Sequence, residues 1–237
     1  MSIRKNPLVN GEYYHIYNRG NNKQKIFCDD ADYDRFIKLL YLCNSNTKFN
    51  FKEDIVQNKI SAWDFERGDQ LVAIGAWVLM PNHFHIYLTP IPKLPKQGFG
   101  KNEQSNITEF MLKLCTAYAK YFNRKYGRTG SLFEGKFKSV HIDNENQAKY
   151  LFSYIHLNPI KLIQSDWKEN GIKDKNEVIN FLYNYKWGSY SDFLEIKRPE
   201  NKILSLDKFI NYFNNPTDFK KEIFDWIDTD STEALLR

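Results

Sequence analysis

Cysteine is scarce in this 237-residue sequence. Cys28, Cys43 and Cys115 are odd in number and none belongs to a Cys-x-x-Cys pair, which excludes a disulfide framework and a zinc ribbon and favours a reducing compartment. Long hydrophobic runs are also missing: no apolar stretch reaches 18 residues, and MSIRKNPLVNGEYYH at the start contains no signal-peptide segment. We therefore expect a cytoplasmic protein that neither crosses a membrane nor has one as a partner.

Aromatic side chains and positive charge are what the sequence has in plenty. Aromatic residues make up 16% of the chain, and they can fill a core or stack on unpaired bases. Residues 1–165 hold 23 Lys and Arg against 15 Asp and Glu, whereas residues 166–237 hold 11 against 14. The basic first part indicates a polyanionic partner.

Hydrophobic periodicity predicts strands at 12–19, 71–79, 83–88 and 131–142, and helices at 29–43, at 107–126 and from a cap at Asp143 to about Leu157. Residues 46–69 are expected to form short strands and loops, and 90–100 a Pro/Gly/Lys loop. The order β-α-β-β-α-β-α predicts an α+β domain over residues 1–165, with helices packed on a central antiparallel sheet. Residues 166–237 are predicted to be a mostly helical accessory extension, either DNA-binding or packed on the core.

The most distinctive local motif is His83-Phe84-His85. Residues i and i+2 of a strand point to the same face, so the two imidazoles can converge on one cation while Phe84 faces the packed side. Two hydrogen-bonded structural histidines would leave the same pattern, so the motif by itself keeps both interpretations open.

A predicted helix face supplies further candidates. Tyr150, Tyr154 and Asn158 recur every four residues and therefore share one face. Two histidines do not complete a metal site, and this face offers a third ligand. The same spacing is typical of core aromatics followed by a helix C-cap before Pro159, and spacing alone leaves that alternative open.

Residues 113–138 are rich in basic side chains and contain a single acidic one, Glu134. Aromatic side chains alternate with the basic ones, which is what a groove for single-stranded nucleic acid requires, although a solvated helix face is an equal alternative. The predicted DNA-binding set is Arg19, Lys113, Lys120, Arg124, Lys125, Arg128, Lys136 and Lys138.

Four segments resemble, in order, the signature of the single-tyrosine HUH transposases, and most closely the REP-associated tyrosine transposases. They are YHIYNRGNNKQKIF near the start, AWVLMPNHFHIYL in the middle, GRTGSLFEGKFKS later and YIHLNPI at 154–160. The resemblance spans roughly residues 10–165, and YKWGSYSDFL at 185–194 resembles the extension of that group. Residues 46–69 look like an insertion relative to compact members.

The resemblance implies a ferredoxin-like (RRM-like) HUH core with named site residues. His83 and His85 match the metal ligands, Phe84 the hydrophobic centre and Tyr154 the nucleophile. Asn158 stands where minimal members use a glutamine as third ligand. Because asparagine is shorter, direct coordination and a bridging water both stay open.

The implied activity is metal-dependent cleavage and rejoining of single-stranded DNA near hairpins, through a 5′-phosphotyrosine. The expected cofactor is Mg²⁺ or Mn²⁺ with no nucleotide, the partner is single-stranded or hairpin DNA, and the location is the nucleoid. Both a monomer and a homodimer are compatible with the family. Two alternatives are a catalytically silent hairpin-binding protein of the same fold and a metal phosphodiesterase that uses water.

Overall fold

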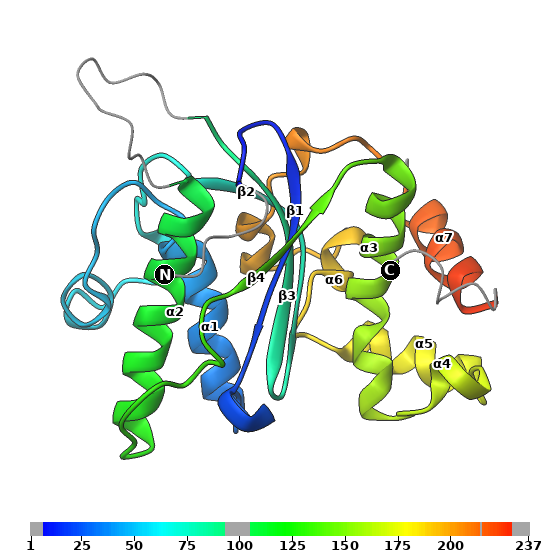
Figure 1. Cartoon of the computed structure of the whole chain (residues 1–237), viewed down its shortest axis with the longest axis horizontal. Coiled ribbons are helices and arrows are strands. Elements are labelled where there is room, and N and C mark those ends of the chain that lie inside the picture. Colours follow the sequence, from blue (N-terminus) through cyan, green and yellow to red (C-terminus); the bar gives the residue numbers. More distant parts are fainter. Residues whose placement is uncertain (1–6, 93–104, 214, 229–237) are drawn as a thin grey trace.

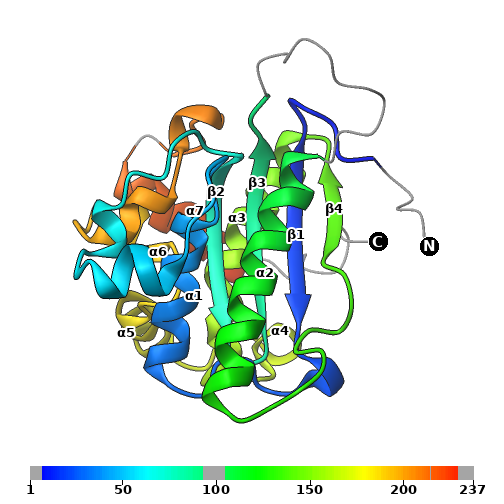
Figure 2. The ribbon, with the colours of Figure 1, turned by 90° about the vertical axis from the view of Figure 1, so that its left-hand side faces the viewer.

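The computed structural model describes residues 7–92, 105–213 and 215–228. Its strands β1 (Tyr13–Arg19), β2 (Val72–Met80), β3 (His83–Pro90) and β4 (Lys138–Ile142) form one antiparallel sheet in the order β2-β3-β1-β4. Helices α1 (Asp30–Leu42) and α2 (Asn106–Lys125) cover one face, and α3 (Glu145–Leu157) covers the other (Figures 1 and 2). This confirms the predicted α+β class, with the strand order of a split β-α-β fold.

The C-terminal segment lies mainly on the same side of the sheet as α3 (Figure 1), and its residues 199–203 reach α1 on the opposite side. It contains α4 (Trp167–Asn170), α5 (Lys175–Asn184), α6 (Tyr190–Phe193) and α7 (Pro216–Asp228). Short helical turns complete the chain: η1 (Asn21–Lys23), η2 (Phe51–Gln57), η3 (Ala62–Asp64), η4 (Asn158–Leu162), η5 (Pro199–Ile203) and η6 (Leu206–Lys208).

The sequence of strand β2 is apolar throughout because the strand is buried along its whole length and on both faces. Its outer edge is covered by the C-terminal segment: Leu79 N donates to Trp187 O at 2.8 Å, and Ser189 N donates to Trp77 O at 2.9 Å. A side chain at Gly75 would lie 2.8 Å from the Phe209 ring, so glycine allows that ring to rest on the sheet. The extension is therefore joined to the core by backbone hydrogen bonds as well as by apolar packing.

Three sequence-based expectations differ from the structure. The last strand begins at residue 138 rather than 131, because Gly130 and Gly135 adopt φ of +82° and +76°, outside strand geometry. Residues 46–69 form no strand; they contain η2 and η3 instead. The cap of α3 is Asn144 rather than Asp143, since its side chain accepts from Gln147 N. Residues 93–100 of the expected loop lie outside the described residues.

Within residues 7–92, 105–213 and 215–228, none of the helices has both the length and the apolar character needed to cross a membrane.

Burial of His156 of α3 should make the fold sensitive to acid. Its ring packs against Phe193 and Phe219, with Nε2 2.9 Å from Ser189 Oγ, and burial lowers its pKa to about 3. Histidine in the unfolded chain binds a proton near pH 6.5. The contribution of His156 to the free energy of unfolding is therefore fully present above that pH and is lost as the pH falls toward 3. From pH 7 to 5 this residue alone should remove about 2 kcal/mol of unfolding free energy.

Urea denaturation at pH 7 and pH 5 checks this expectation. His156→Gln keeps a partner for Ser189 and cannot titrate, so its acid-induced loss should be about 2 kcal/mol smaller than that of the wild type. Equal losses in the two proteins would show that His156 does not cause the acid sensitivity.

Candidate functional site

The two histidines of β3 lie on one face of the sheet, and Phe84 lies on the other. Strand alternation produces this arrangement: the His83 and His85 rings are 5.0 Å apart, centroid to centroid, and nearly perpendicular at 85°. Phe84 is fully buried against Phe36 of α1, with ring centroids 5.0 Å apart. The face that carries the histidines is the one that α3 covers.

Hydrogen bonds fix which ring nitrogen of His83 is free. Asn82 Nδ2 donates to Lys23 O at 3.1 Å, which turns Asn82 Oδ1 toward the ring, 2.6 Å from His83 Nδ1. An amide oxygen only accepts, so His83 Nδ1 carries the proton and donates. Its Nε2 therefore has a free lone pair.

His85 is held in a similar way by another histidine. His15 of β1 brings Nε2 to 2.8 Å from His85 Nδ1, with the rings stacked at 5.0 Å. His85 Nε2 is buried and has no hydrogen-bond partner among the described residues. A buried nitrogen with no partner costs free energy, and a ligand bound there would remove that cost.

Burial keeps these imidazoles neutral. It lowers the pKa of His83 to about 4 and that of His85 well below 6.5, and positive charge on Lys161 acts in the same direction on both. Neutral imidazole is the form that binds a metal.

The residues that are present fit a divalent ion. The Nε2 atoms of His83 and His85 share one face, and their Nδ1 atoms are engaged by neighbours, as in known histidine metal sites. In the tautomer in which His85 Nδ1 donates to His15, both Nε2 atoms offer a lone pair. In the part of the chain that the structure describes, no group of three or more His, Cys, Asp or Glu gathers to hold a metal. Further ligands would have to be neutral, such as the Asn158 amide or water, or come from a substrate phosphate.

Tyr154 faces the histidines from α3. Its ring centroid is 5.2 Å from that of His85 and 6.0 Å from that of His15. Burial raises the pKa of the phenol, while the neighbouring Asn158 amide lowers it. At neutral pH the hydroxyl is therefore protonated, and Asn158 favours the phenolate.

Asn158 lies at the point where α3 gives way to η4, next to Pro159. Its side chain is close enough to His83 and Tyr154 to affect the pKa of both. It is buried, yet neither polar atom makes a hydrogen bond of ordinary geometry with any described residue. An uncompensated buried amide beside the His83 imidazole and the Tyr154 phenol is a ligand candidate rather than a simple cap.

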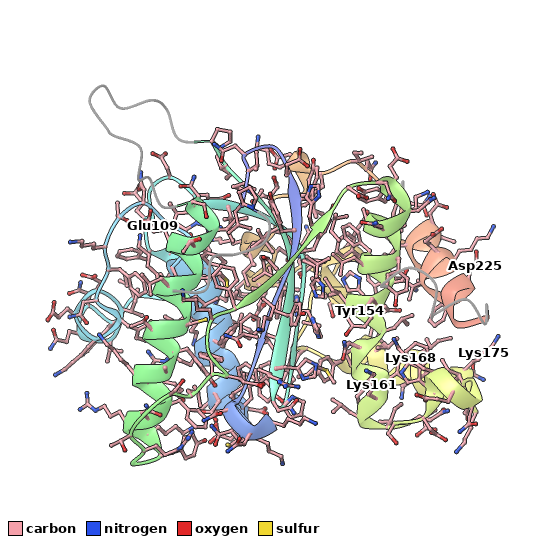
Figure 3. All side chains as sticks on the ribbon, viewed as in Figure 1. Glu109, Tyr154, Lys161, Lys168, Lys175 and Asp225 are labelled. Carbon is pink, nitrogen blue, oxygen red and sulfur yellow. The ribbon has the colours of Figure 1, made fainter. Side chains whose placement is uncertain are left out.

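Two lysines complete the site, and Figure 3 shows them near Tyr154 on the same side of the sheet. Lys168 Nζ of α4 lies over the Tyr154 ring, 4.9 Å from its centroid. Burial lowers the pKa of Lys168, and the charge on Lys161 adds to that effect. Neither ammonium forms an ion pair with a carboxylate within the described ranges, so both can meet an anion.

The predicted DNA-binding residues separate into two groups. Arg19 and Lys138 point to the side of the histidines, since they pair with His83 and Tyr17 across the strands. Arg19 also forms an ion pair with Glu134. Lys136 is exposed just before β4, and Arg128 follows α2 with its guanidinium 5.6 Å from the centroid of the Phe122 ring.

The α2 members of the set lie across the sheet from Tyr154. These are Lys113, Lys120, Arg124 and Lys125. The structure therefore does not bring them to the histidines.

Sequence reasoning did not single out His15, Lys161 or Lys168. The sequence did carry a signal for His15. It lies in a predicted strand two residues before Tyr17 and four before Arg19, so the three side chains share one face of that strand. No local signal marks Lys168, because it reaches Tyr154 only through the docking of α4.

His15 should control metal binding without touching the metal. His15→Phe removes the partner of His85 Nδ1, so we expect Mn²⁺ affinity to fall about 10–100-fold. His15→Gln offers an amide oxygen in its place and should stay closer to the wild type. Calorimetric titration with Mn²⁺ at pH 7.5 measures this; unchanged affinity in His15→Phe would exclude the role.

No family model matches the chain, and no curated protein matches it. Among solved structures, a REP-associated tyrosine transposase bound to a REP hairpin aligns over 84% of this chain and 90% of its own, with 15% identity and a TM-score of 0.44. A candidate transposase from Deinococcus radiodurans aligns over 63% of this chain and 93% of its own, with 15% identity and a TM-score of 0.32. The chain is thus similar to the structures of a REP-associated tyrosine transposase and of a candidate transposase.

Proposed function

We propose that this chain cuts and rejoins single-stranded DNA, with Tyr154 as nucleophile and a divalent metal ion held by His83 and His85. The observation that carries the proposal is the convergence of a tyrosine from α3 with two neutral imidazoles from β3. The ordered motifs support a transposase-like substrate, a DNA strand next to a hairpin.

In the proposed reaction, Tyr154 Oη attacks the phosphorus of a phosphodiester. The Oη–P bond forms and the P–O3′ bond breaks, so the number of phosphoester bonds is unchanged and a 3′-OH can reverse the step without ATP. The phenol gives up its proton, and the departing O3′ takes one up. Since burial raises the pKa of Tyr154, positive charge nearby is needed to favour the phenolate.

Each neighbour of the tyrosine has a role in this scheme. His83 and His85 would hold a metal ion through Nε2, His15 and Asn82 orient their rings, and Asn158 would contribute an amide. A bound divalent ion would supply Lewis-acid polarisation of the phosphate, and two imidazoles suit Mn²⁺ better than Mg²⁺. Lys161 and Lys168 add positive charge where the phosphate oxygens must lie.

A labelled hairpin oligonucleotide with a single-stranded flank, incubated with the protein and Mn²⁺, tests the proposal. A denaturation-resistant protein–DNA adduct is expected. Binding without an adduct across varied hairpins would favour a silent hairpin-binding protein. Cleavage without an adduct would favour a phosphodiesterase that uses water.

Lys168 should affect the chemistry of the tyrosine. Lys168→Met removes the ammonium above the Tyr154 ring, so we expect adduct formation to slow by about 10–100-fold, the effect of losing one electrostatic contact to the reacting group. The phenolate becomes less favourable, so the alkaline rise of the rate should shift to higher pH.

Two variants separate this role from general effects of charge. Lys168→Arg keeps the charge and should recover much of the rate. Lys173→Met removes an ammonium that lies 3.8 Å from Asp166 and is 73% exposed, and it should leave the pH profile unchanged. A pH profile that is identical in Lys168→Met and the wild type would contradict the assignment.

A further inference from the structure

A large groove lies on the face of the sheet opposite Tyr154. It has a volume of ≈ 1080 Å³ and runs between α2 and residues 47–56, with α1 at its base. Figure 3 shows the separation, since Glu109 of α2 and Tyr154 lie on opposite sides of the sheet. Because a packed core and four strands stand between them, the groove is distinct from the histidine site.

The side chains that line the groove carry an excess of positive charge. Seven basic residues line it and no acidic residue does: Arg35, Lys48, Lys52, Lys113, Lys120, Arg124 and Lys125. Two of them are neutralised, because Lys113 pairs with Glu109, and Lys125 pairs with Asp29 and Asp32. The other five form no ion pair with any residue in the described ranges.

The walls between these cations are aromatic and apolar. The Arg35 guanidinium stacks on Phe51 at 3.5 Å and lies 4.7 Å from the centroid of Tyr121. Leu112 and Val56 line the same groove, and at 59% and 57% they are the most exposed large hydrophobic side chains among the described residues. Apolar faces at the base of a basic rim match the two parts of a single-stranded nucleic acid, its bases and its phosphates.

We propose that this groove is a second binding site, for single-stranded nucleic acid, separate from the site of Tyr154. A second copy of the chain would present the same basic rim and be repelled. A bare polyphosphate would leave the apolar walls exposed to water. The proposal does not depend on cleavage at Tyr154.

Fluorescence anisotropy with a labelled dT12 oligonucleotide tests the proposal in a Tyr154→Phe background, where no adduct can form. The groove variant combines Lys52→Ala, Lys120→Ala and Arg124→Ala. A matched control combines Lys197→Ala, Lys220→Ala and Lys221→Ala, which removes the same charge from exposed positions of the C-terminal segment. Circular dichroism and thermal unfolding verify that both variants are folded.

We expect the groove variant to bind dT12 at least about 10-fold more weakly than the control variant. The slope of the logarithm of the binding constant against the logarithm of the salt concentration should be smaller by about two. An abasic 12-mer of equal charge should bind the parent protein about 10-fold more weakly than dT12, because it has no bases to stack. An rU12 arm shows whether RNA or DNA is preferred.

Photocrosslinking of dT12 that carries 5-iodouracil locates the contact. Crosslinks to Phe49, Phe51 or Tyr121 are expected. Equal affinity of the groove and control variants, equal binding of the abasic strand, or crosslinks restricted to α3 and α4 would each overturn the proposal. Adduct formation by the protein with intact Tyr154 is measured separately, so failure here and failure of the cleavage proposal are distinguishable.

Discussion

Tyr154→Phe is expected to abolish the covalent protein–DNA adduct while hairpin binding persists. The substitution removes one oxygen atom and leaves the ring in contact with His85 and His15. Loss of a nucleophile costs on the order of 10⁶-fold in the reactions where it has been measured, so no adduct should be detectable. Gel shifts in the presence of EDTA measure the retained binding.

Tyr150→Phe is the matched control. Tyr150 lies one helical turn away, with its ring 6.2 Å from that of Tyr154, and it is more buried. It should keep most of the adduct, and fragmentation of the tryptic peptide 150–161 should place the nucleotide on Tyr154. An adduct that survives in Tyr154→Phe, or one found on Tyr150, would reassign the nucleophile.

His85→Ala is expected to remove both metal binding and metal-dependent cleavage. His85 supplies one of two neutral nitrogen ligands, and with a single imidazole left the site has little to hold a divalent ion. Mn²⁺ affinity should fall by more than about 100-fold, beyond the effect of an outer partner such as His15. Adduct formation should slow by roughly 10³-fold, because metal polarisation of a phosphate stabilises the transition state by several kcal/mol.

His141→Ala is the control for this experiment. His141 lies on β4 opposite Tyr14, so it points to the other face of the sheet, and it pairs with Glu12 near the surface. It should keep the Mn²⁺ affinity of the wild type. Because His85→Ala leaves His15 without its partner, thermal unfolding must show that the variant is folded. A folded His85→Ala protein with undiminished Mn²⁺ affinity would exclude the proposed metal site.

Metal binding should weaken only as the pH falls toward 4, where the His83 ring takes up a proton. Since the pKa of His83 is lowered to about 4, the ring remains neutral well below the pH at which free imidazole binds a proton. The buried environment thus keeps the His83 ring in the neutral form that binds a metal.

The sequence by itself determined most of the elements and the local relations within each one, but not the start of β4 or the helical turns within residues 46–69. Alternation along β3 puts His83 and His85 on one face, and helical spacing puts Tyr154 above Asn158, because both relations depend only on backbone period. The continuous apolar run at 71–79 predicts a buried central strand; β2 is buried on both faces, but it lies at the edge of the sheet, where the C-terminal segment covers it.

Only the tertiary structure decided which residues far apart in the chain lie side by side. His15 meets His85 because β1 pairs with β3, and Lys168 meets Tyr154 because α4 docks beside α3. The basic side chains of α2 and the tyrosine of α3 lie on opposite faces because the two helices pack on opposite sides of the sheet. No local pattern encodes these pairings, since packing of the assembled layers selects them.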